Sequence, residues 1–219
     1  MRACLTPYVD RPLCSKSRLV GSYSMHAMGA NCLSVRLQSL QYQSGPSSSL
    51  LTELCVCSGG DDQAIGVLSL SLHLTAPCSV ESHAAAEVQI SIEACRVVRI
   101  HGACGSAIKG VSSMALPGQD ATRAFGLVSV GYDQRLSLWE YSETSPSADH
   151  SSTSKCTEEH YDLSVSGPAG GHATCPLQWK GGSVVNVGDV NSMALQQSTG
   201  GVHIAVVGEG FQEFHIIPE

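Results

Sequence analysis

Two groups of residues in this chain have the side chains of a hydrolytic triad. Each group has a histidine followed later by a serine and an aspartate four residues apart: His26, Ser58 and Asp62, and His101, Ser129 and Asp133. A carboxylate that orients an imidazole, which takes a proton from a serine hydroxyl, makes that hydroxyl a nucleophile. Ester or peptide hydrolysis is therefore the first chemistry that these residue types suggest.

The sequence around these serines argues against catalysis. A nucleophilic serine must be exposed beside an oxyanion hole, but Ser129 lies between Val128 and Val130, and the chain has no Gly-x-Ser-x-Gly elbow. The same Ser–Asp spacing recurs at Ser58, which favours architecture because an active site rarely occurs once per repeat. We therefore predict a structural hydrogen-bond network and no enzymatic activity.

Trp139 extends the second group, because it follows Asp133 by six residues, as in a WD-type blade. In such a blade, the aspartate binds the N–H groups of a turn, the imidazole links it to the serine hydroxyl, and the indole N–H closes the network. Leu68 occupies the tryptophan position of the first group. The predicted blade network therefore comprises the six residues above and Trp139.

Short apolar alternations place these residues on strands. The segments 54–68 and 127–139 each read as a strand, a Gly–Asp turn and a second strand, and convincing helical periodicity is absent. A histidine-bearing loop and an apolar strand precede each hairpin, and an outer strand follows, which makes a four-stranded blade. The predicted fold is thus all-β, a partial WD-type β-propeller of about three four-stranded antiparallel blades, at 26–100, 101–187 and 188–217.

The remaining residues are predicted to lie outside the blades. Residues 1–17 are expected to be poorly ordered, so that the propeller segment spans 18–219. Two insertions, at 75–92 and 141–175, are expected to be disordered, because the second is rich in Ser, Thr, Pro and Gly and cannot bury enough apolar area to order itself. The third blade is degenerate, with Gly210 in place of the turn aspartate. Three blades cannot close a ring of typically four to eight, so this chain alone leaves it open.

The chain shows no pattern for a metal or a cofactor. Its ten cysteines include no Cys-x-x-Cys pair, which disfavours zinc and favours reduced structural thiols. Cys55 and Cys57 share one face of a predicted strand, where they would pack as small apolar side chains. Neither a phosphate-binding loop nor a dinucleotide-binding glycine motif is present.

Charge and hydropathy limit the classes of partner. The net charge of −7 opposes a stand-alone nucleic-acid-binding domain, so any role with RNA must be shared with a more basic partner or with a further part of the chain. The chain has no apolar run of about 20 residues that could span a membrane, and its first residues lack the apolar core of a secretory signal. We expect a soluble cytoplasmic protein that binds neither membranes nor small-molecule substrates.

Several motifs are more specific than a generic blade. They include Ser-Gly-Gly-Asp-Asp-Gln-Ala-Ile at 58–65, Gly-Tyr-Asp-Gln-Arg-Leu-Ser-Leu-Trp at 131–139, and Gly-Glu-Gly-Phe-Gln at 208–212. With them, roughly residues 18–217 outside the insertions resemble the C-terminal end of the family of WD repeat-containing protein six. That family is longer, with several propellers, and is the non-catalytic partner of a tRNA ribose 2′-O-methyltransferase acting at the anticodon wobble position.

The resemblance implies a scaffold that binds the methyltransferase and helps to position tRNA, while the catalytic groups lie on the partner. Arg135, on the exposed side of a hairpin, is the candidate for an RNA or partner contact, although most surface arginines are only solvated. Two other interpretations stay open at this point. In the first, the chain is a generic WD scaffold in another complex. In the second, it is a non-functional fragment of a longer propeller protein.

Overall fold

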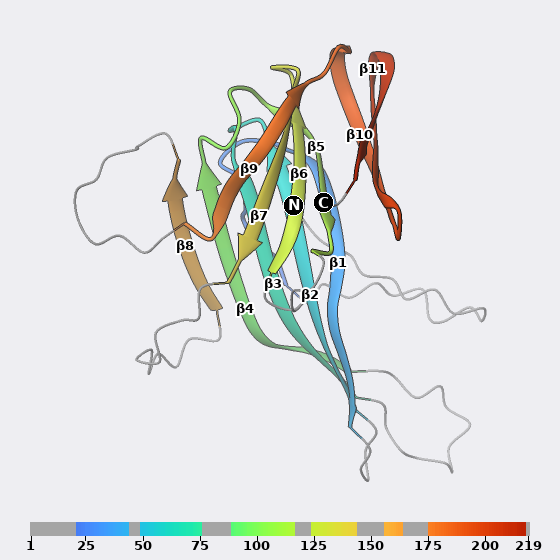
Figure 1. Cartoon of the computed structure of the whole chain (residues 1–219). Coiled ribbons are helices and arrows are strands. Elements are labelled where there is room, and N and C mark those ends of the chain that lie inside the picture. Colours follow the sequence, from blue (N-terminus) through green and yellow to red (C-terminus); the bar gives the residue numbers. More distant parts are fainter. Residues whose placement is uncertain are drawn as a thin grey trace, which may run out of the picture.

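The structure is a computed structural model that describes residues 21–43, 49–75, 89–116, 124–143, 156–163 and 175–217. In these ranges every regular element is a β-strand, and the strands form three sheets (Figure 1). The prediction of an all-β fold is confirmed. None of the sheets closes into a barrel, and their arrangement is consistent with part of a β-propeller.

The first sheet is an antiparallel meander with one added strand. Its order is β1 (Ala30–Gln43), β2 (Ser49–Gly60), β3 (Ile65–Thr75), β4 (Gln89–His101) and β8 (Cys156–Asp162), of which β8 pairs with β4 in parallel. Gly60, at the end of β2, leaves room for the imidazole of His26, which a Cβ at this position would overlap. Gln63 completes the tight turn between β2 and β3 with a φ of 62°.

The second sheet repeats the meander, and the third is a hairpin. The second sheet has the order β5 (Ile108–Met114), β6 (Ala124–Gly131), β7 (Arg135–Ser142) and β9 (Leu177–Val184), and the third pairs β10 (Gly188–Ser198) with β11 (Gly201–Ile216). The turn between β6 and β7 repeats the positive φ of the first sheet, at Gln134 with a φ of 56°. The two hairpins predicted at 54–68 and 127–139 are therefore confirmed, and they lie in different sheets.

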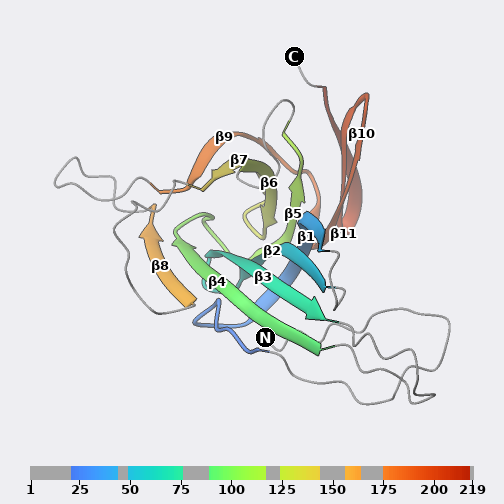
Figure 2. The same ribbon diagram turned by 90° about the horizontal axis from the view of Figure 1, so that it is seen from below.

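The three sheets pack face to face. In the view from below (Figure 2), β5 lies between β1 and β10, the first strands of the neighbouring sheets. Every residue of β6 is buried, because one face of this strand packs on the first sheet and the other on the third. Phe125 and Leu127 point into the first interface, whereas Val128 and Val130 point into the second.

The structure corrects the predicted blade boundaries. Strands β1–β4 of the first sheet correspond to the blade expected at 26–100, and the second sheet to the blade expected at 101–187. The first sheet departs from a four-stranded antiparallel blade, because β8, from within 101–187, joins it as a fifth, parallel strand. The expectation of a four-stranded blade at 188–217 is wrong within the described residues, where this segment forms only a two-stranded hairpin. The expected poorly ordered stretch at 1–17 lies outside the described residues.

Both insertions expected to be disordered contain ordered strand. Residues 89–92 belong to β4, and the insertion at 141–175 contains the end of β7 and the whole of β8. Residues 76–88, 144–155 and 164–174 lie outside the described part of the chain. Ion pairs join β8 to β4 in addition to the backbone pairing of the two strands. Arg96 donates two 2.8 Å hydrogen bonds to Glu159, and Arg99 lies 3.5 Å from Glu158.

A disulfide also joins β8 to the first sheet. Cys95 on β4 is bonded to Cys156 on β8, which corrects the expectation that all cysteines are reduced. The chain leaves the second sheet after β7, pairs with β4 of the first sheet as β8, and returns to the second sheet as β9. β8 therefore ties the two sheets together. Cys55 and Cys57 are both fully buried, which confirms that they pack as apolar side chains.

Candidate functional site

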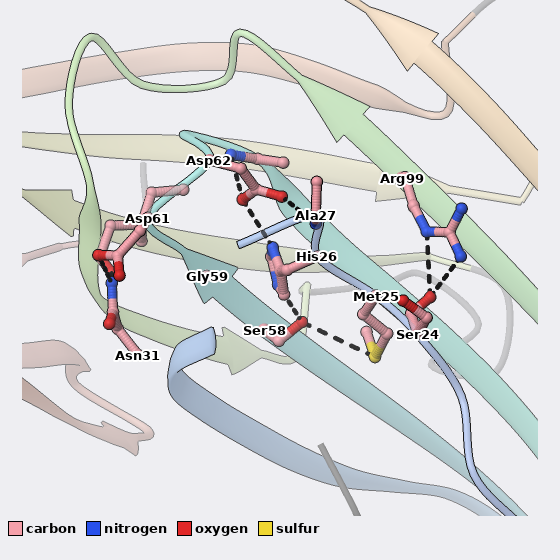
Figure 3. Close-up of polar contacts among 12 residues, drawn as sticks. Ser24, Met25, His26, Ala27, Asn31, Ser58, Gly59, Asp61, Asp62 and Arg99 are labelled. Carbon is pink, nitrogen blue, oxygen red and sulfur yellow. Dashed lines mark hydrogen bonds and ion pairs between the residues drawn. The ribbon is translucent and has the colours of Figure 1, made fainter. Parts of the chain in front are cut away.

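The first predicted network is assembled at the end of β2. His26, in the segment before β1, places Nδ1 2.8 Å from Asp62 Oδ1 and Nε2 2.8 Å from Ser58 Oγ (Figure 3). The backbone N–H of Ala27 donates to Asp62 Oδ2 at 2.9 Å. When Nδ1 carries the proton and donates to the carboxylate, Nε2 accepts from the Ser58 hydroxyl. The network therefore fastens the entry segment to both the second strand and its turn.

Asp62 holds the turn as an anion. Burial raises the pKa of this carboxyl, but hydrogen bonds from His26 and from the N–H groups of Ala27 and Ala64 outweigh burial and lower the pKa below its ordinary value. Ala64 donates to the same oxygen as His26, at 3.3 Å. The ionised carboxylate thus satisfies three donors that would otherwise be left without a partner at the sheet edge.

The order Ser–His–Asp in this network is that of a hydrolase, but the surroundings are not. The side chain of Ser58 is 1 % exposed, and Met25 Sδ lies 3.8 Å from its hydroxyl (Figure 3). The adjoining cavity, lined by residues such as Met25 and Met28, has a volume of about 60 Å³. That is room for very few waters, whereas pockets for small molecules measure about 300–1,000 Å³. The geometry therefore suits a structural link.

The second network differs from the first at two positions, the histidine and the tryptophan. Trp139 Nε1 donates to Ser129 Oγ at 2.9 Å, which brings these two predicted residues together in the core. Asp133 accepts from the N–H of Gly105 at 3.1 Å and from that of Arg135 at 3.3 Å. No histidine of the described ranges joins them. Cys104 lies there instead, with Sγ 3.6 Å from Ser129 Oγ.

The prediction that His101 belongs to this network is wrong. His101 ends β4 and stacks on His160 of β8, with ring centroids 6.0 Å apart. Cys104 corresponds to His26, because each precedes the first strand of its sheet by four residues and the following N–H binds the turn aspartate. That spacing before the strand was the signal in the sequence. The nearest upstream histidine, His101, does not have this spacing.

Trp139→Phe is expected to lower the free energy of unfolding by about 1–3 kcal/mol, because it leaves the buried Ser129 hydroxyl without its donor. Urea unfolding followed by circular dichroism measures this loss. Trp179→Phe is the matched control, since Trp179 is 64 % exposed and the structure gives its indole N–H no partner among the described residues. Equal stability of the two variants contradicts a contribution from the Trp139–Ser129 hydrogen bond.

Polar contacts also join the turns of the two sheets. Lys109 Nζ lies 3.3 Å from Asp61 Oδ1 and 4.5 Å from the centre of the Tyr132 ring. Asn31 donates to Asp61 at 2.7 Å (Figure 3) and to the carbonyl oxygen of Ile108 at 3.1 Å. The hydrogen bonds from Asn31 and Lys109 lower the pKa of Asp61. The first and second sheets are thus held in register at this edge.

A groove of about 640 Å³ opens beside the second network. Its lining combines acidic, basic, aromatic and small polar side chains, and includes Cys104, Asp133, Arg135, Trp139, Trp179 and Ser183. Arg135, the residue predicted to make an RNA or partner contact, is exposed at this groove. Trp179 was not singled out in the sequence, although an aromatic residue on an outer strand is a usable signal.

Comparison of the chain with models of known protein families and with curated proteins found no match. The described part of the chain contains no helix that could cross a lipid bilayer. The same residues bring no three His, Cys, Asp or Glu side chains together as a metal-binding group. The assignment of function therefore depends on the two networks, the groove and the sequence motifs.

The chemistry of Cys104 argues against a nucleophilic role in the groove. Burial raises the pKa of its thiol to about 11, an effect that Asp133 reinforces and that the hydrogen bond with Ser129 only partly offsets. At neutral pH the thiol is protonated, whereas cysteine nucleophiles act as thiolates. The Cys104 thiol is thus not an activated nucleophile.

Proposed function

We propose that the chain is part of a WD-type β-propeller that acts as a non-catalytic scaffold. It binds a tRNA ribose 2′-O-methyltransferase and helps to position tRNA for methylation of the wobble nucleoside. The single observation that carries the scaffold assignment is the link of His26 to Ser58 and Asp62, through two 2.8 Å contacts. This network joins the entry segment, the second strand and its turn, as expected for a WD blade.

The second sheet supports the same assignment. Its Asp133 turn repeats the Asp62 turn of the first sheet, with a cysteine in the histidine position. Its Ser129–Trp139 hydrogen bond adds the tryptophan that the first sheet lacks. Rigid sheets that present short turns at one edge suit recognition, because loops on a rigid frame bind with little loss of entropy. The buried serines and the protonated Cys104 thiol offer no activated nucleophile.

The identity of the partner is proposed from the motifs at 58–65, 131–139 and 208–212. The net charge of −7 fits a subunit that contacts RNA only together with a more basic protein. In this complex the methyltransferase would supply the methyl-transfer chemistry and this chain would supply orientation.

Affinity capture with the tagged full chain tests this function. We expect recovery of a ribose 2′-O-methyltransferase, and we expect added chain to raise 2′-O-methylation of the wobble nucleoside in tRNA by the purified enzyme. The tag alone is the control for capture, and heat-denatured chain is the control for stimulation. An enzyme that is fully active alone and does not associate with the chain contradicts the proposal.

A further inference from the structure

The groove beside the second sheet contains an open space at the position that a histidine ring fills in the first sheet. In the first sheet, the imidazole of His26 donates to the turn carboxylate and is 2 % exposed. In the second sheet, the smaller side chain of Cys104 takes that position, and Asp133 receives only backbone N–H groups among the described residues. The space beside Asp133 is therefore open to a planar ring that carries an N–H donor.

An exposed aromatic side chain borders the same space. Trp179 on β9 is 64 % exposed and pairs across the strands with Trp139, which is 5 % exposed and faces the core. An indole held at the edge of a groove is a stacking platform, since a base stacked on an aromatic side chain contributes about 1–3 kcal/mol. Trp179 and Asp133 thus offer a stacking face and a hydrogen-bond acceptor within one site.

Arg135 supplies a cation at this site. It begins β7, is exposed, and forms no side-chain ion pair within the described ranges. The other cation of this region, Lys180, is already paired with Glu140 at 2.8 Å. Arg135 is therefore the side chain that can meet an anionic group carried by a ligand stacked on Trp179.

We propose that this groove binds one unstacked nucleotide of a single-stranded RNA. The base stacks on Trp179, its amino group donates to Asp133, and its phosphate lies against Arg135. The volume of about 640 Å³ falls in the range of small-molecule sites. This inference rests on the proposed function, in which the RNA is the tRNA and the more basic partner supplies most of the remaining phosphate contacts.

RNA fits this groove better than a peptide for two reasons. Adenine, cytosine and guanine each combine a flat stacking face with an amino donor, which matches Trp179 and Asp133 together. Single-stranded RNA also exposes its bases, whereas the bases of a duplex are stacked. One phosphate contact predicts a modest dependence on salt, in agreement with the acidic charge of the chain.

Fluorescence anisotropy of a labelled seven-nucleotide adenine oligoribonucleotide, titrated with the full chain at low salt, tests the proposal. We expect Trp179→Ala to weaken binding about tenfold or more, because the stacked base is lost. Arg135→Ala is expected to reduce the slope of log binding constant against log salt concentration by about 1, the value for one phosphate contact. Phe211→Ala is the matched control, because Phe211 on β11 is also an exposed aromatic residue, at 61 %, but does not line the groove.

Cys104→His provides a second variant that preserves the fold. It restores the imidazole found in the first sheet, so it fills the space beside Asp133. We expect this variant to lose oligonucleotide binding while its melting temperature stays the same or rises. Binding that is unchanged in Trp179→Ala, or weakened equally in Phe211→Ala, overturns the proposal.

The outcomes separate this inference from the proposed function. If Trp179→Ala abolishes capture of the methyltransferase but leaves oligonucleotide binding unchanged, the groove is a protein interface and the RNA site is wrong. If the methyltransferase binds the chain and the oligonucleotide does not, only the groove proposal fails. If the oligonucleotide binds through Trp179 and no methyltransferase is recovered, the partner assignment fails and the groove proposal stands.

Discussion

Under oxidising conditions, Cys95→Ser is expected to lower the free energy of unfolding by about 4 kcal/mol. The disulfide with Cys156 spans a sequence separation of 61 residues, and closing so long a loop removes much conformational entropy from the unfolded chain. Urea unfolding of the oxidised wild type and of the variant measures the difference. The ion pair of Arg96 with Glu159 remains in the variant, so its loss does not contribute to the difference.

A thiol reductant is the control for this effect. After reduction, wild type and Cys95→Ser are expected to unfold at nearly the same urea concentration. Cys175→Ser is a second control, because the thiol of Cys175 is free and half-buried, and its substitution leaves the cross-link intact. Equal stabilities under oxidising conditions, together with the absence of a Cys95–Cys156 peptide in a non-reducing digest, contradict the disulfide.

Asp62→Ala is expected to lower the free energy of unfolding by about 2–4 kcal/mol, because it removes one partner of a buried, charge-assisted network. His26, Ala27 and Ala64 all lose their acceptor. Urea unfolding at neutral pH measures the loss. Asp61→Ala is the matched control, since the neighbouring carboxylate is exposed and its contacts are screened by water, so a much smaller loss is expected.

The carboxylate of Asp62 also makes the free energy of unfolding depend on pH. Because the pKa of Asp62 is lower in the folded protein than its ordinary value of 3.8, its contribution is present above that value and disappears as the pH falls through the folded pKa. Asp62→Asn is therefore expected to weaken the dependence of the free energy of unfolding on pH in the range below about 3.8. A pH dependence identical to that of the wild type in this range contradicts an ionised Asp62 in the folded network.

The features that the sequence predicted are those that depend on local pattern. Alternating apolar residues and a Gly–Asp turn located both hairpins, because a strand must bury one face and the turn must satisfy its own N–H groups. The spacing of Ser58 and Asp62 together with the histidine-bearing loop before β1 identifies the three residues of the first network, His26, Ser58 and Asp62.

The features that the sequence did not predict depend on long-range pairing. β8 lies in a segment without apolar alternation, and its Glu158 and Glu159 meet arginines roughly 60 residues away only after folding. The pairing of Cys95 with Cys156 cannot be deduced from the spacing of ten cysteines. The replacement of histidine by Cys104 was missed because a cysteine carries no motif of its own.

The complete burial of β6 has a consequence for the order in which the chain becomes protected during synthesis. β6 leaves the ribosome before β10 and β11, yet Val128 and Val130 are covered by the third sheet. These side chains stay open to solvent, and to chaperones, until the final hairpin has emerged. The second sheet therefore completes its folding only after translation has passed well beyond it.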